Sequence, residues 1–320
     1  MTGPLPLQFG MVGARRDHLE RLRGYGFRRC EAVLLFPEDR DWLREYLAGM
    51  DQFSTHFPLF REEHFPDYPL KLALVDPDAE RRRVAVDLLR RELDRAAEWG
   101  ARHVVAHLQR NLLEEESPPP GDERAGVALA AETAAPLLEH ARAVGVPLHL
   151  ENMMGSPLLH SPEAYRELGE ALPELRYCLD VGHAAIDGRF FGFPESELAE
   201  AMGPSLGSLH IYDNHLPREI HFRTLREEGL LRKYPVHPEH YADAAAEWID
   251  TPGCLRAALA ARPEALVTFE VYYSMDTDHA QTAEGIEWTI GYCRELSGTY
   301  PGGVRSQTTA PRRRPSLKEG

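Results

Sequence analysis

The chain has 320 residues, of which 43% are hydrophobic and 27% charged, and its formal net charge is −15. This composition is typical of a globular protein with a large core, and no apolar run is long enough to cross a membrane. The acidic balance repels a phosphate polymer, so a nucleic-acid partner is not expected. The four cysteines are scattered without a CxxC pair, and the first residues show no secretory signal. Both features favour a cytoplasmic protein.

Short β-rich runs alternate with longer helical runs along the chain. The candidate strands are residues 7–13, 30–36, 52–58, 103–109, 147–152, 177–183, 208–213 and 267–273. The candidate helices are residues 38–49, 79–99, 123–144, 161–171, 195–202, 253–262 and 280–296. Alternating strands and helices predict parallel strands joined by helical crossovers. Eight such strands predict an α/β fold, a single (β/α)8 TIM barrel.

The barrel is expected to span residues 1–300, with residues 301–320 forming a separate tail. This tail is basic and rich in proline and arginine, with almost no apolar residues. Such a segment cannot bury enough surface to offset its conformational entropy, so it is expected to be disordered.

Ser161 and Pro162 open one of the candidate helices with the residue types that favour an N-cap and a first turn.

Six consecutive candidate strands carry a histidine or a carboxylate near their C-terminal ends, on the side opposite to their apolar residues. These residues are His56, His107, Glu151, Asp180, His210 and Glu270. One inward histidine is more often a hydrogen-bonded core residue than a ligand. Three inward carboxylates at one barrel mouth, however, cannot all stay ionised without a cation. Oxygen and imidazole ligands suit a divalent metal such as Mn, Zn, Co or Mg.

Four segments carry a resemblance to a known family. They are "LHLEN" around Glu151, "CLDVGHA" around Asp180, "LHIYDN" around His210 and "FEVYY" around Glu270. In this order, on the last four strands, they resemble the xylose-isomerase-like TIM barrels. That superfamily includes sugar phosphate isomerases and epimerases, dehydratases and endonuclease IV.

The resemblance implies one divalent metal held by Glu151, Asp180, His210 and Glu270. It also implies that Glu151 and Glu270 are catalytic and move a proton beside the substrate carbonyl, through an ene-diolate that the metal stabilises. His183, His107 and His56 would then bind the substrate. The expected protein is a metal-dependent isomerase or epimerase of carbohydrate metabolism. Its small-molecule substrate would be a sugar, a sugar phosphate or a hydroxy-keto acid.

Three alternatives stay open. A dehydratase or lyase could use the same metal and base, and a barrel could bind a metabolite without converting it. An endonuclease-IV-like phosphoester hydrolase would hold two or three zinc ions. Its additional ligands would be His56, His107, His183, Glu219 and His221, with Asp213 and His215 as substitutes for the last pair. Relatives of this shape often form dimers or tetramers, so a homo-oligomer is also open.

Overall fold

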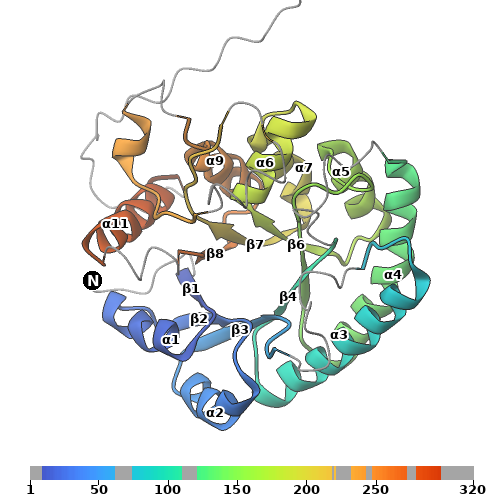
Figure 1. The fold of residues 1–320 in the computed structure, drawn as a ribbon, viewed down its shortest axis with the longest axis horizontal. Coiled ribbons are helices and arrows are strands. Elements are labelled where there is room, and N and C mark those ends of the chain that lie inside the picture. The colour runs from blue at the N-terminus through green and yellow to red at the C-terminus, as the bar shows by residue number, and fades with distance from the viewer. Residues whose placement is uncertain are drawn as a thin grey trace, which may run out of the picture.

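The computed structural model describes residues 9–61, 74–109, 121–217, 220, 232–242, 247–271 and 279–296. Its centre is a closed barrel of parallel strands in the order β1 to β8, with β8 pairing back onto β1. Helices surround this barrel on the outside (Figure 1). The predicted TIM barrel is therefore confirmed. The expected boundary at residue 300 and the tail beyond it lie outside the described residues.

The elements follow the alternation expected from the sequence. The strands are β1 (Phe9–Gly13), β2 (Arg29–Ala32), β3 (Gln52–Phe57), β4 (Val104–His107), β5 (Leu148–Glu151), β6 (Arg176–Asp180), β7 (Leu206–Ile211) and β8 (Leu266–Phe269). The helices are α1 (Arg16–Leu22), α2 (Arg40–Ala48), α3 (Ala79–Trp99), α4 (Glu123–Val144), α5 (Pro162–Ala171), α6 (Val181–Phe191), α7 (Glu195–Met202), α9 (Thr251–Ala261) and α11 (His279–Leu296). Short 3-10 turns are η1 (Arg23–Tyr25), η2 (Pro37–Asp39), η3 (Gly203–Ser205) and η4 (Pro238–Tyr241).

Side-chain caps explain where several helices begin. The residues whose side chains accept from backbone N–H groups of the first turn are Asp78, Asp122, Ser161, Asp180 and Asp250. Each satisfies donors that have no partner within the helix. The cap at Ser161, with proline following it, is as predicted.

Several strand ends differ from the expected bounds, and two helices are not among the candidate helices. The strand expected over 30–36 ends at Ala32, and the strand expected over 177–183 ends at Asp180. Helices α1 and α6 were not expected at all. At the end of β6, the Asp180 side chain accepts from the His183 N–H at 2.8 Å, and α6 begins directly there. A short apolar run that continues from strand into helix shows no change of period by which the boundary could be read.

The main core lies between the strands and the surrounding helices. Outward-facing strand residues such as Leu150 and Leu179 pack there against helical residues such as Leu137 and Leu168, all fully buried. The four cysteines are buried and unpaired. The inside of the barrel carries the polar residues instead. Within the described ranges, no helix is both long and apolar enough to cross a bilayer.

Candidate active site

Histidines and carboxylates from neighbouring strands meet at the C-terminal end of the barrel. Strand pairing places His107 beside Glu151 across β4 and β5, and Asp180 beside His210 across β6 and β7. Glu270 follows the last residue of β8. Because the ends of parallel strands lie at the same edge of a barrel, these side chains converge as the sequence predicts.

Three of the four predicted metal ligands form one compact group. Asp180, His210 and Glu270 offer ligand atoms that all lie within 4.8 Å of one another. Asp180 Oδ2 and His210 Nδ1 are buried and make no hydrogen bond within the described part of the chain. A divalent cation would satisfy a buried oxygen and a buried imidazole nitrogen that make no hydrogen bond. These residues therefore fit a metal.

Glu151 lies at the edge of this group. Its Oε1 is 3.6 Å from His210 Nδ1, and it forms a second candidate group with Asp180 and His183, again within 4.8 Å. The four predicted ligands thus lie in two overlapping groups.

His56 holds the Glu151 carboxylate. Its Nε2 lies 2.7 Å from Glu151 Oε2, and its Nδ1 lies 3.0 Å from the Phe57 carbonyl oxygen. Since both acceptors lack a hydrogen, both ring nitrogens donate and the imidazole is positively charged. Burial opposes this charge, but the hydrogen bond and the charge of Glu151 raise the pKa of His56 above its usual value. Burial likewise would raise the pKa of Glu151, but His210, His107 and His56 hold it well below the ordinary range.

His107 and His183 flank the same carboxylate. His107 Nε2 is 3.6 Å from Glu151 Oε2, and burial lowers the pKa of His107 to about 3, so its ring is neutral. The His183 Nδ1 donates to the Asn152 carbonyl at 2.9 Å and lies 3.5 Å from Glu151 Oε1. Of the three predicted substrate-binding histidines, His107 is the most exposed, with 20% of its side chain accessible against 7% for the others. Their role in binding a substrate stays a prediction.

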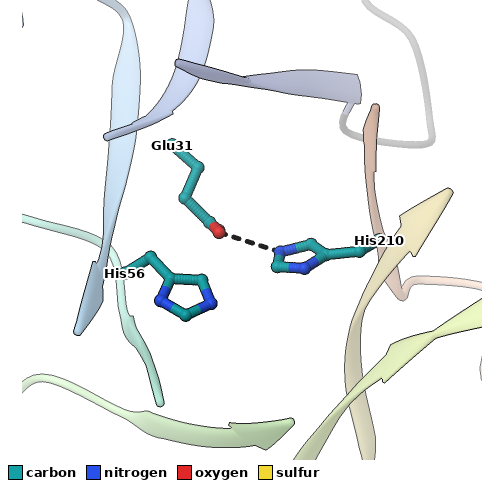
Figure 2. Close-up of side chains that lie close together, drawn as sticks. All are labelled: Glu31, His56 and His210. Atoms are coloured by element: carbon teal, nitrogen blue, oxygen red, sulfur yellow. Dashed lines mark hydrogen bonds and ion pairs between the residues drawn. The ribbon is translucent and has the colours of Figure 1, made fainter. Parts of the chain in front are cut away.

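Glu31 on β2 is a site residue that the sequence reasoning missed. It is fully buried, and its Oε1 accepts from His210 Nε2 at 2.8 Å while its Oε2 accepts from Ser54 Oγ at 3.0 Å. Figure 2 shows the Glu31 carboxylate pointing at the His210 ring, with His56 beside both. Because Nε2 carries its hydrogen toward Glu31, Nδ1 is left facing the metal group. A carboxylate in the apolar run "CEAVLLF" was the available signal, since strand alternation turns it inward.

Lys233 is the second missed residue. Its Nζ lies 2.5 Å from Glu270 Oε2 and 3.5 Å from Asp180 Oδ2, and it stands over the Tyr212 ring at 4.2 Å from the centroid. Burial would lower the pKa of Lys233, but Glu270, Tyr212 and Asp180 raise it well above its usual value. Burial raises the pKa of Glu270, although Lys233 opposes this. Nothing in the local sequence marks this lysine, because it lies in the long connection after β7.

The additional ligands of a multinuclear site are placed only in part. Glu219 and His221 lie outside the described residues. Asp213, offered as their substitute, is fully buried and accepts from His240 Nδ1 at 2.6 Å and from the Tyr241 hydroxyl at 2.5 Å. These bonds hold the connection after β7 in place. His215 packs edge-on against Trp248. His56, His107 and Glu151 do form a further candidate group within 4.8 Å.

The family model described as "Xylose isomerase-like TIM barrel" matches residues 19–292. The chain belongs to this family, and the resemblance read from its strand-end motifs is confirmed. A search of curated proteins finds no match.

Solved structures agree with the fold at low sequence identity. An L-ribulose 3-epimerase is 19% identical, with a TM-score of 0.62, over 91% of this chain and 96% of the other. D-psicose 3-epimerase from Clostridium cellulolyticum, solved with D-tagatose, is 12% identical with a TM-score of 0.57, over 91% and 99%. A protein from Thermus thermophilus, soaked with ZnCl2, is 21% identical with a TM-score of 0.55, over 92% and 100%. These likenesses show a shared barrel.

Proposed function

We propose that this protein is a metal-dependent isomerase or epimerase of a small sugar, sugar phosphate or hydroxy-keto acid. The observation that carries the proposal is the buried pair of Asp180 Oδ2 and His210 Nδ1, which make no hydrogen bond within the described residues and lie in one ligand group with Glu270 at the barrel mouth. Membership of the xylose-isomerase-like family and the sugar epimerases among its structural neighbours support the substrate class.

Glu151, Asp180, His210 and Glu270 would hold the ion, which when bound would polarise the carbonyl and the adjacent hydroxyl of the substrate. Mn, Zn, Co or Mg would suit these ligands. Glu31 and His56 would fix two of the ligands, since they hold the His210 ring and the Glu151 carboxylate. Two of the four proposed ligands would thus already be oriented before the ion binds.

Glu151 and Glu270 would move the proton. They lie three strands apart around the barrel mouth, on β5 and after β8, so they would approach a substrate held near His210 from different sides. One carboxylate would take the proton from the carbon beside the carbonyl, and the other would return a proton to that carbon or its neighbour. His107 would donate a hydrogen bond to a substrate hydroxyl, and His183, whose Nδ1 already donates to Asn152, would accept one at Nε2.

A phosphoester hydrolase with two or three zinc ions is the second candidate. One observation favours it: His56, His107 and Glu151 form a ligand group separate from that of Asp180, His210 and Glu270. Because both His56 nitrogens donate to other partners, a second ion there would first have to displace the His56–Glu151 hydrogen bond.

Metal content per chain, followed by solvent-deuterium exchange into ketoses and keto acids, tests the first proposal. About one metal ion and deuterium at a substrate carbon, lost in both Glu151→Gln and Glu270→Gln, would support it. Full exchange in both variants would refute it. Two or three zinc ions per chain with turnover of phosphate esters would favour the hydrolase.

A further inference from the structure

The connection after β7 returns to the barrel mouth and is fastened there. The backbones of Asp213 and Tyr234 pair reciprocally, with the Asp213 N–H donating to the Tyr234 carbonyl at 2.7 Å and the Tyr234 N–H donating to the Asp213 carbonyl at 2.9 Å. The hydrogen bonds from His240 and Tyr241 to the buried Asp213 carboxylate fix the same place. The residue before Tyr234 is therefore held against the end of β7.

That residue is Lys233, and its side chain runs inward. Only 12% of it is exposed. The ammonium lies between Glu270 Oε2 and Asp180 Oδ2, over the face of Tyr212. The hydroxyl of Tyr212 donates in turn to Asp180 Oδ1 at 2.9 Å. A buried ammonium is stable only where acceptors surround it, and two carboxylates and an aromatic face supply this surrounding.

The acceptors of this lysine are the same residues that would hold the metal. Asp180 and Glu270 belong to the compact ligand group, and the oxygens that face the ammonium are the ones without hydrogen bonds. An ammonium and a divalent ion compete for these two oxygens, because two cations placed against the same pair of carboxylates repel each other.

We propose that Lys233 is a built-in competitor of the metal: its ammonium occupies the cation position between Asp180 and Glu270, and a divalent ion binds there only after this ammonium has moved out. This inference rests on the metal site of the proposed function. The apparent metal affinity of the protein is then the intrinsic affinity of the open site multiplied by the fraction of molecules in which Lys233 has left it. The displaced ammonium stays tethered beside Tyr234, at the mouth where a substrate enters.

Amine labelling tests the displacement directly. The chain has three lysines, Lys71, Lys233 and Lys318, so the other two serve as internal references. The full chain is stripped with a chelator and labelled with an amine-reactive ester, with and without Mn²⁺, and each lysine is followed by mass spectrometry. We expect Mn²⁺ to accelerate labelling of Lys233 by about tenfold or more relative to the references. The reason is that Mn²⁺ increases the fraction of molecules in which the Lys233 ammonium has left the site and is accessible to the reagent.

Metal affinity gives a second readout. Lys233→Met should bind Mn²⁺ about tenfold or more tightly than the unmodified chain. Arg232→Met is the matched control, because it removes the same charge from the neighbouring, exposed residue and should leave the affinity unchanged.

Binding of Mn²⁺ with labelling of Lys233 unchanged or slower would overturn this inference alone. Equal gains in both variants would also overturn it, since the effect would then be long-range charge. Absence of Mn²⁺ binding in every variant would overturn the proposed metal site and the inference with it.

Discussion

Replacing Glu31 by glutamine is the sharpest test of how the barrel prepares the metal site. The carboxylate is fully buried and accepts one hydrogen bond from His210 Nε2 and one from Ser54. Glutamine has the same shape, so it leaves no cavity. The amide offers one oxygen in place of two, and where that oxygen accepts from Ser54 its NH2 group faces His210 Nε2. In this orientation the imidazole moves its hydrogen to Nδ1, the nitrogen that faces the metal group. In the reverse orientation the amide oxygen still accepts from Nε2, but without the charge of the carboxylate, so support of the His210 ring is weakened in both.

The size of the effect follows from the loss of the carboxylate that supports His210. A metal-ligating histidine whose carboxylate partner is lost typically binds its ion about 10–100-fold more weakly, which is about 1.4–2.7 kcal/mol. We expect Glu31→Gln to weaken Mn²⁺ binding by this factor while the protein still folds. Calorimetric titration of the chelator-treated chain measures the affinity, and thermal unfolding of the same samples confirms the fold.

A matched control comes from helix α3. Glu92 is also buried, 5% exposed, and pairs with Arg95 at 3.1 Å on a helix outside the barrel. Glu92→Gln should leave Mn²⁺ affinity unchanged. If folded Glu31→Gln binds Mn²⁺ as tightly as the unmodified chain, the tautomer argument is refuted. Imidazole nitrogen spectra would then show His210 with its hydrogen still on Nε2.

Three further substitutions probe the fold around the site. Burial lowers the pKa of His149 to about 3, against about 6.5 in the unfolded chain, so its contribution to stability is complete above about pH 6.5 and is lost as the pH falls. In His149→Gln, the free energy of unfolding should therefore fall less steeply between about pH 6.5 and pH 3, by about 1 kcal/mol per pH unit. Denaturant titrations at several pH values measure this, and parallel plots of unfolding free energy against pH for the two proteins would contradict it. A Cβ at Gly182 would overlap the Tyr212 ring. Gly182→Ala should therefore lower the free energy of unfolding by about 1–3 kcal/mol, and with it the melting temperature. An unchanged melting temperature would disprove the close contact. Burial raises the pKa of Asp187 well above its usual value, although the Gly155 N–H opposes this. Asp187→Asn should therefore stabilise the protein at pH 7 by about 1–3 kcal/mol, and this gain should vanish in acid. A lower free energy of unfolding at pH 7 would contradict this prediction.

Much of the barrel and its mouth could be predicted from local pattern. Strand alternation with a period of two separates apolar from polar residues, and this placed His56, Glu151 and His210 on the inside correctly. The parallel arrangement then brought their strand ends together without any further information. Glu31 obeys the same alternation and was within reach of this reasoning.

Other features depend on contacts that no local pattern encodes. Tyr212 approaches Gly182 closely at the start of α6, and these two residues come from different parts of the chain. The choice between a free Asp213 and one bound to His240 depends on how the connection after β7 folds back.

The sequence by itself therefore determined the class of fold and the ring of histidines and carboxylates at its mouth, because both follow from side-chain periodicity within single strands. Only the tertiary structure decided how those groups are paired. Glu31 orients His210 and Lys233 lies between Asp180 and Glu270, because residues distant in the chain, or brought in by an irregular connection, meet inside a closed barrel. Periodicity carries no information about such encounters, since it describes only which face of its own element a residue occupies.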